Sequence, residues 1–416
     1  MKLRIHRGTR EIGGTCVEIE SGADRILLDL GLPLNTDSPL SVELPAVSGL
    51  IEPDAALKAI ILSHGHRDHW GLLPKARSDI PLIMGKATAR IMRAAADFIP
   101  DGFAPAATQG LENRKPMQIG TFVVTPFLVD HSGFDAYALL IEADNRRLFY
   151  SGDLRAHGRK EKLFDELVRN PPNDIDVMLM EGSSLGRLRD DEKFETESSL
   201  ERRFIDRFKQ SQGMVLVACS AQNIDRVVTI YRAAKQSGRT LIIDAYAAEV
   251  LKATGHDSIP KPVAGRSNLA VYIPQRQRVA LKRKGIASMV DGYRGFRVWP
   301  EELAELAPRA VMLFRSWMFS DLDKAGALKN AALIWSQWEG YLADGGGAAL
   351  KESCTTRRIP FEIIHTSGHA SPGDLKRLAT AIAPGRLIPI HTFARGRFPE
   401  LFNNVNLIDD GQWLEV

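Results

Sequence analysis

The first 180 residues alternate short apolar runs with polar turns, which is the pattern of buried and half-buried strands. The runs are CVEIES, RILLDLG, AIILSHG, FVVTPFLVDHS, YALLIEA, RRLFYSGD and DVMLMEG. Helical spacing appears after PLIMG, where Ala87, Ile91 and Phe98 share one face of the stretch 86–99. We therefore predict a strand-rich first part with a helix that covers its sheet.

From about Ser184 the pattern changes to strands that alternate with helices. SSLERRFIDRFKQ and NIDRVVTIYRAAKQSG have helical spacing, whereas GMVLVACS and RTLIIDAY are apolar strands. This order is typical of a parallel, doubly wound α/β unit. After a Gly-rich break, ADGGGAAL at 343–350, the strand-rich pattern returns. We predict a first domain over 1–184, an inserted α/β domain over 185–354, and a segment over 355–416 that completes the first domain.

Composition adds few constraints. The chain is 44% hydrophobic and 25% charged with a net charge of +3, so a site for a polyanion must come from local clustering. Its three cysteines lack CxxC spacing, which argues against a disulfide framework or a thiolate zinc site. No apolar segment approaches the roughly 18 to 20 residues of a membrane span, and none follows the basic N-terminus. We expect a soluble, cytoplasmic protein without a membrane partner.

Histidines and aspartates gather directly after several apolar runs. The candidates are His64, His66, Asp68, His69, His131, Asp153 and His391. Side chains two apart in extended backbone point the same way, so His64 and His66 can bind one cation together. A single histidine at a strand end is more often an ordinary loop residue, but HxHxDH followed by three further strand-end ligands is not expected by chance. The pattern predicts a hydrolytic site for two metal ions.

The predicted insert carries a basic segment. Residues 266–297, from Arg266 onward, hold eight Arg or Lys against one acid, with three aromatic residues interleaved. Basic residues with stacking aromatics could bind a single strand, with Arg278, Lys282 and Lys284 as candidates. The alternative is the solvated face of a helix. In CSAQNIDR, Ser220 and Asn223 could contact substrate or cap the next helix, and we favour the cap.

Taken together, these motifs resemble the metallo-β-lactamase superfamily. SHGHRDH, His131, SGD and His391 are similar to its ligand motifs, and Glu181 in MEGSS, His369 in HTSGHASPGDL and His391 in PIHTF are similar to motifs A, B and C of the β-CASP nucleases. Within that group the chain most resembles ribonuclease J and its short relatives, including the opening REIGGTCVEI. The resemblance implies an αββα sandwich with an inserted, doubly wound β-CASP domain.

Two stretches depart from this resemblance. HWGLLP stands where relatives often have a Gly-Gly pair, and the chain ends soon after DDGQWLEV. We therefore expect no additional C-terminal domain, and the oligomeric state, a homodimer included, stays open.

The resemblance also implies a role for each site residue. One metal ion would be held by His64, His66 and His131, and the other by Asp68, His69 and His391, with Asp153 as the bridge. Asp68 would also orient the attacking water, His369 would protonate the leaving sugar oxygen, and Glu181 would orient a histidine. These ligands suit zinc, and manganese is also compatible with them.

The turn HTSGHAS suggests a second polar site. Ser367, the Gly368 and Ala370 amides and the His369 ring could converge on one anion. In ribonuclease J-like proteins the corresponding turn cradles phosphate, which implies a preference for 5′-monophosphorylated RNA. The alternative is that Ser367 caps the helix that begins near Pro372.

We expect a metal-dependent phosphodiesterase that cleaves single-stranded RNA between its two domains, as a 5′ exonuclease, an endonuclease or both. The nearest alternative is a DNA nuclease of the same group, although the DNA-processing branch tends to carry valine at the position of His391. A nucleic-acid-binding module without activity would have lost ligands that are present here. A small-molecule hydrolase of the glyoxalase type would need neither the insert nor His369.

Overall fold

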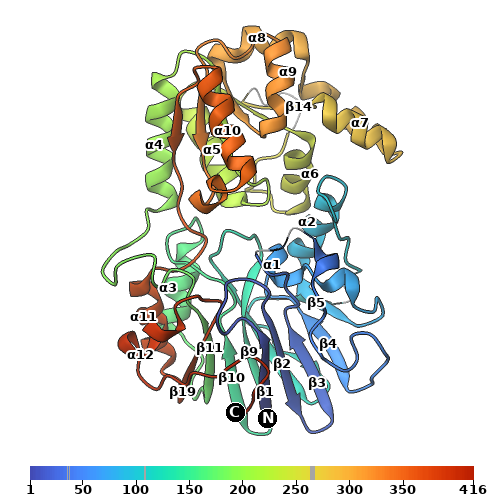
Figure 1. Cartoon of the computed structure of the whole chain (residues 1–416), viewed down its shortest axis with the longest axis vertical. Helices are drawn as coiled ribbons and strands as arrows, with labels where there is room; N and C mark the ends of the chain where they lie inside the picture. The colour runs from blue at the N-terminus through green and yellow to red at the C-terminus, as the bar shows by residue number, and fades with distance from the viewer. Residues whose placement is uncertain (35, 37, 107–108, 263–267) are drawn as a thin grey trace. The chain divides into compact units, whose positions relative to one another are not determined.

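The protein folds into two compact units. The structure, a computed structural model, describes residues 1–34, 36, 38–106, 109–262 and 268–416, and Figure 1 shows its elements in chain order. Unit 1 comprises Met1–Arg93, Phe103–Phe194 and Gly368–Val416, and unit 2 comprises Ala94–Gly102 and Glu195–Ser367. Residues 355–367 belong to unit 2 because they include a strand of its sheet. The assignment of domains to families stays a prediction.

Unit 1 contains two packed β-sheets. The first has the strand order β20(Trp413–Glu415), β1(Lys2–Arg7), β2(Cys16–Ser21), β3(Asp24–Leu28), β4(Leu57–Ile61), β5(Leu82–Gly85) and β6(Gln109–Leu111). The second has the order β19(Arg386–Ile390), β11(Val177–Glu181), β10(Arg146–Tyr150), β9(Ala136–Ala143), β8(Phe122–Val129) and β7(Met117–Ile119). One apolar cluster contains side chains from both sheets and forms the core between them.

Helices cover the outer faces of both sheets, so the predicted αββα sandwich is confirmed. The first sheet packs on α1(Arg67–Trp70) and α2(Lys86–Ala96), and the second on α3(Glu161–Arg169), α11(Pro372–Ile382) and α12(Phe398–Leu401). Figure 1 shows α3, α11 and α12 beside β11 and β19. No helix in the described part of the chain is both long and apolar enough to cross a bilayer.

The strand pleat explains why these strands are apolar without interruption. In β4, Ala59 and Ile61 face the core between the sheets, whereas Ile60 faces the helix layer. Ile26 and Leu27 in β3 divide between the two cores in the same way. Because successive side chains point to opposite faces and both faces are covered, polar residues are excluded until the strand ends.

Unit 2 contains the predicted doubly wound α/β fold. Its strands run β15(Arg297–Val298), β14(Leu269–Tyr272), β13(Thr240–Ile243), β16(Ala310–Leu313), β12(Val215–Ala218), β17(Ala332–Trp335) and β18(Phe361–Ile363), and every pair is parallel. Its helices are α4(Glu197–Gln210), α5(Ile224–Gln236), α6(Ala245–Ala253), α7(Gln275–Arg283), α8(Leu303–Leu306), α9(Phe319–Lys324) and α10(Gly345–Thr356).

The Gly-rich stretch that the sequence presents as a break is the start of α10. Asp344 caps this helix, and its side chain accepts a hydrogen bond from the Gly347 amide at 2.7 Å. The cap satisfies an amide that the first turn leaves without a helical partner. A side chain on Gly347 would lie 2.4 Å from the Leu342 backbone, which explains a glycine inside this helix.

Candidate metal centre

The second sheet brings its polar residues to one edge. β10, β11 and β19 are parallel, and β8 runs the same way because β9 is antiparallel to both β8 and β10. His131 follows β8, Asp153 follows β10, Glu181 ends β11 and His391 follows β19. Four distant parts of the sequence therefore meet at the carboxyl edge of this sheet.

The first sheet contributes the HxHxDH motif through the loop after β4. His66 is the residue before α1, and Asp68 and His69 lie within this four-residue helix. Trp70 ends α1, and its Nε1 donates a hydrogen bond to the Gly65 carbonyl at 2.9 Å. This hydrogen bond joins the end of α1 to the loop that carries the histidines.

One group of candidate ligands consists of three imidazoles. The His66 Nδ1 atom lies 3.1 Å from His64 Nε2 and 3.0 Å from His131 Nε2. Burial and the neighbouring imidazoles hold the pKa values of His64 and His131 well below the usual histidine value. Neutral imidazoles have a lone pair for a cation, so this group could hold a metal ion.

A second group contains Asp68, His69, Asp153 and His391, with one potential ligand atom from each within 4.8 Å of the others. The His69 Nε2 atom lies 3.2 Å from Asp153 Oδ2 and 3.9 Å from Asp68 Oδ2. His391 Nε2 lies 3.6 Å from Asp153 Oδ2 and 3.8 Å from Asp68 Oδ2. Two imidazoles and two carboxylates are suitable ligands for zinc or manganese.

Asp153 lies between the two groups. Its Oδ2 atom, 3.2 Å from His69 in the second group, is also 3.7 Å from His64 Nε2 and 4.0 Å from His131 Nε2 in the first. Among the described residues, Asp153 Oδ1, His69 Nε2 and His391 Nε2 are buried without a hydrogen bond. Leaving buried polar atoms without partners is costly, and divalent ions would provide partners for all three. The donor set therefore fits metal ions.

Neighbouring groups orient the imidazoles. His69 Nδ1 donates to Asp29 Oδ2 at 2.8 Å, and His131 Nδ1 donates to the Gly368 carbonyl at 2.6 Å. A proton on Nδ1 leaves the Nε2 lone pair directed into the centre. Sequence reasoning missed Asp29, although it directly follows β3 within the run RILLDLG, just as other site residues follow their strands. Its side chain is fully buried and also accepts a hydrogen bond from Tyr150 Oη at 2.6 Å.

The charge distribution of the centre favours cations. Burial lowers the pKa of His69, but Asp153, Asp29 and Asp68 more than offset this and raise it well above the usual value. Burial raises the pKa of Asp153, but His391 and His69 lower it well below the usual value. The Asp153 carboxylate therefore stays ionised and attracts positive charge.

His369 lies beside this centre. Its Nδ1 atom is 3.3 Å from Glu181 Oε1 and 3.8 Å from Asp153 Oδ2. Burial lowers the pKa of His369, but Glu181 and Asp153 raise it above the usual value. Glu181 is fully buried and also accepts a hydrogen bond from the Ser183 amide at 3.0 Å. A fixed carboxylate therefore orients an imidazole that can carry a proton.

The turn before α11 is only partly as the sequence predicts. Gly368, whose carbonyl accepts from His131, begins the third segment of unit 1, and Ser367 ends unit 2. The Ala370 amide donates to Glu181 Oε1 at 3.4 Å. The alternative that Ser367 caps the helix is wrong, because Ser371 directly precedes α11 and accepts from the Asp374 amide. Anion binding by Ser367, Gly368 and Ala370 stays a prediction.

The substrate-binding candidates of unit 2 have different environments. Arg278 and Lys282 are exposed on α7, and Lys284 follows this helix and lies 3.6 Å from Asp97 in the same unit. Asn223 caps α5 by accepting from the Arg226 amide at 3.1 Å, as we favoured. The exposed Ser220 accepts a hydrogen bond from the Gln222 amide at 3.2 Å. Arg266 lies outside the described residues.

Comparisons with known proteins agree with this architecture. A family profile described as "Beta-lactamase superfamily domain" matches residues 25–215, so the chain carries a domain of that superfamily. A crystal structure of a protein of unknown function from Enterococcus faecalis V583 has the same fold, with a TM-score of 0.81, 19% identity and 99% of each chain covered.

The curated proteins that are similar to this chain have more specific names than the family profile. Ribonuclease J of Helicobacter pylori strain 26695 is 21% identical and matches 100% of this chain and 61% of its own length. Ribonuclease J of Mycoplasma genitalium is 25% identical, with 94% of this chain and 67% of the relative covered. Ribonuclease J2 of Bacillus subtilis strain 168 is 23% identical, with 92% and 68% covered. The chain is therefore similar to ribonuclease J proteins, and it spans about three fifths of the length of the first relatives that it matches.

Proposed function

We propose that this protein is a two-metal ribonuclease of the β-CASP group, which hydrolyses phosphodiester bonds of single-stranded RNA. The observation that carries the proposal is the position of Asp153, whose Oδ2 atom lies within 4.0 Å of His64, His69, His131 and His391. A carboxylate shared by two ligand groups is what a pair of adjacent divalent ions requires. When bound, such ions lower the pKa of water and neutralise charge on phosphate.

The surrounding residues have three roles: they bind the ions, orient the attacking water and orient the histidine rings. His64, His66 and His131 would hold one ion, and Asp68, His69 and His391 would hold the other. Zinc is the expected metal, and manganese is compatible with the same ligands. Asp68 is the carboxylate of the centre with the more exposed side chain, at 16% against 2% for Asp153, so it can also orient the attacking water. Asp29 and the Gly368 carbonyl hold the rings of His69 and His131 in the ligating tautomer.

His369 supplies the proton to the leaving oxygen of the ribose. Its Nδ1 atom lies 3.8 Å from Asp153 Oδ2, and its pKa is above the usual histidine value because Glu181 and Asp153 outweigh burial. A histidine whose pKa is raised by neighbouring carboxylates is suited to general acid catalysis. Glu181 positions the ring.

RNA is the proposed substrate because the curated relatives are named ribonuclease J. The exposed basic residues Arg278, Lys282 and Lys284 bind its backbone, and Ser220 and Asn223 are placed on the turn before α5. Ser367 and the Gly368 and Ala370 amides hold a 5′ monophosphate, which favours 5′ exonuclease action over cleavage within the strand.

The test is incubation of purified protein with end-labelled RNA and DNA of the same sequence, with zinc, manganese or a chelator. We expect cleavage of RNA that requires metal and is lost in His64→Ala and Asp68→Ala, whose metal content falls in parallel. Cleavage of DNA alone would make the protein a DNA nuclease, and binding of RNA without any cleavage would make it an inactive module.

A second comparison uses one RNA with a 5′ monophosphate, triphosphate or hydroxyl. We expect the monophosphate to be trimmed fastest, and Ser367→Ala to reduce that preference. Equal rates on all three ends, with internal fragments first, would establish an endonuclease instead.

A further inference from the structure

Unit 2 has a segment whose positive charges are mostly unpaired. Residues 275–299 contain seven Arg or Lys and one acid, Asp291, which pairs with Arg294 at 3.0 Å. Lys284 lies 3.6 Å from Asp97. Five positive side chains form no ion pair within the described part of the chain, and they attract a polyanion. They are Arg297 and, exposed on α7, Arg276, Arg278, Lys282 and Arg283.

The sheet brings the two ends of this segment together. β15 is an edge strand and runs parallel to its neighbour β14, and neighbouring strands lie about 4.8 Å apart. Trp299, which follows β15, is therefore at the same edge of the sheet as Pro274, the residue before α7. The Gln275 amide donates to Asp321 Oδ2 at 2.8 Å, which ties the start of α7 to α9. Figure 1 shows α7 extending away from the sheet of unit 2 beside β14.

Trp299 adds an aromatic surface to this edge. It is 41% exposed, and the Arg297 Cζ atom lies 4.0 Å from the centroid of its ring. The Arg297 Nε atom is buried and forms no hydrogen bond among the described residues, so the ring holds this guanidinium in place of a carboxylate. A second pair of the same kind joins Arg276 to Trp317, with Cζ 5.7 Å from the ring centroid. The exposed part of the Trp299 ring remains open to a second stacking partner.

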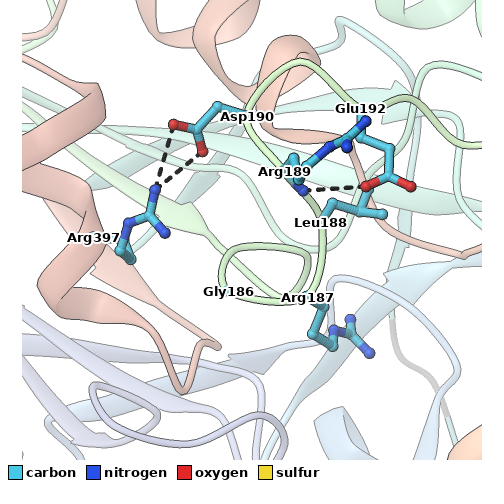
Figure 2. A pocket seen from close by; sticks show the side chains of 7 residues that line it. All are labelled: Gly186, Arg187, Leu188, Arg189, Asp190, Glu192 and Arg397. Atoms are coloured by element: carbon cyan, nitrogen blue, oxygen red, sulfur yellow. Dashed lines mark hydrogen bonds and ion pairs between the residues drawn. The ribbon is translucent and has the colours of Figure 1, made fainter.

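The arginines around the loop after β11 in unit 1 differ in this respect. Figure 2 shows Arg397 paired with Asp190, at 3.2 Å, and Arg397 Nε also lies 2.6 Å from Glu400. Arg189 lies 3.6 Å from Asp191. Charges that are already paired contribute little to binding a polyanion. Unpaired cations beside an exposed ring therefore distinguish residues 275–299 from this loop.

We propose that unit 2 by itself forms a contact site for single-stranded RNA, in which a base stacks on Trp299 and the unpaired cations of α7 bind the backbone. This inference rests on the proposed ribonuclease function and adds to it a site that contains none of the metal ligands. Cations bind the phosphates of single and double strands alike, whereas stacking on a side chain requires a base whose face is free. Trp299 therefore makes the site selective for single strands.

The experiment measures binding of labelled RNA to the full chain in excess chelator, by fluorescence anisotropy. Trp299→Ala should weaken binding of a single strand about tenfold, which corresponds to 1.4 kcal/mol and lies within the range for one stacked base. Its affinity for a duplex of the same length should equal that of the parent, which also shows that the variant is folded. Trp299→Phe keeps an aromatic ring and should retain most of the affinity. Neither variant removes a charge, so the salt dependence should not change.

Arg297→Gln and Arg357→Gln form a matched pair of charge variants. Arg357 belongs to the same unit and also lies on an aromatic ring, with Cζ 4.6 Å from the centroid of Phe319, but it is paired with Asp323 at 2.7 Å. Arg297→Gln should weaken binding of single strands and duplexes and reduce the salt dependence. Arg357→Gln should change neither. The difference between the two variants measures the effect of the unpaired charge.

The outcomes separate this inference from the function on which it rests. If the parent cleaves RNA but Trp299→Ala binds the single strand as tightly as the parent, the site is wrong and the ribonuclease remains. An equal loss of affinity for single strand and duplex would also overturn it, because a patch for any polyanion behaves in that way. If the parent cleaves no RNA, a selective loss of single-strand binding in Trp299→Ala still supports the site. A parent that binds no RNA in chelator would overturn it.

Discussion

Asp29→Asn should disable the metal centre without removing a single ligand. The Asp29 carboxylate accepts hydrogen bonds from the Ser63 amide, Ser63 Oγ and His69 Nδ1, each at 2.8 Å, and from Tyr150 Oη at 2.6 Å. Asparagine has the same shape but replaces one acceptor oxygen with a donor. If the amide nitrogen faces His69, the imidazole must accept there and move its proton to Nε2, the atom that faces Asp153.

The size of the effect follows from these contacts. A lost orienting partner of a metal-ligating histidine typically lowers metal affinity 10- to 100-fold, which is about 1.4 to 2.8 kcal/mol. Either orientation of the new amide leaves at least one of the four donors without an acceptor in a fully buried position. The free energy of unfolding should therefore also fall by about 1 to 3 kcal/mol.

Metal affinity is measured by competition with a coloured chelator, and stability by denaturant unfolding in excess chelator. Asp54→Asn is the matched control, because Asp54 also accepts several hydrogen bonds, from Ser48, Arg25 and the Ala56 amide, but belongs to a separate ion-pair network. We expect normal metal affinity in the control. Parent-like metal affinity in Asp29→Asn would refute the tautomer argument, even if the protein were less stable.

Three further predictions concern the acid, the basic segment and acid stability. His369→Ala should slow RNA cleavage by roughly two to four orders of magnitude with RNA affinity retained, since general acid catalysis contributes that much; an equal loss of affinity would make it a binding residue. Neutralising the exposed basic side chains Arg278, Lys282 and Lys284 should reduce the dependence of RNA affinity on salt concentration. An unchanged salt dependence would contradict their assignment as RNA-binding residues. Burial raises the pKa of Glu18, but hydrogen bonds from His6, Arg4 and Arg25 lower it to about 2 from its ordinary 4.5. The folded pKa is depressed, so its stabilisation is complete above pH 4.5 and is lost as the pH falls toward 2. Glu18→Gln should flatten that part of the unfolding curve, whereas an unchanged curve would assign acid sensitivity to other carboxyl groups.

The strands and the ligands at their ends were predictable because one rule governs both. An apolar run in a sheet covered on both faces must end where polar residues begin, and there the side chains are available for chemistry. The run FVVTPFLVDH gives β8 and then His131, and RLIPIH gives β19 and then His391. The spacing HxHxDH is local, so its four candidate ligands could be found without knowledge of the tertiary structure.

The remaining features depend on contacts between distant segments. A single aspartate after an apolar run is common, so nothing in the sequence singles out Asp29 until β3 and α1 are placed side by side. By helix propensity, the glycines at 345–347 predict a break. In the structure α10 begins there, capped by Asp344. The capping residue is a local signal for a helix, but in the sequence interpretation the glycines outweighed it.

Two residues of the metal centre have a left-handed backbone conformation. His391 and Asp29 are non-glycine residues with positive φ angles, 54° and 59°, a conformation that costs of order 1 kcal/mol or more in each case. Neither sequence position offers the glycine or asparagine that would relieve it. The fold holds His391 in place through its amide, which donates to the Gly8 carbonyl at 2.7 Å. The bend at His391 comes directly after β19 has paired with β11, and there the imidazole reaches Asp68 and Asp153. The left-handed backbone at His391 therefore turns its side chain from the end of the edge strand β19 toward the two carboxylates, which agrees with its proposed role as a ligand.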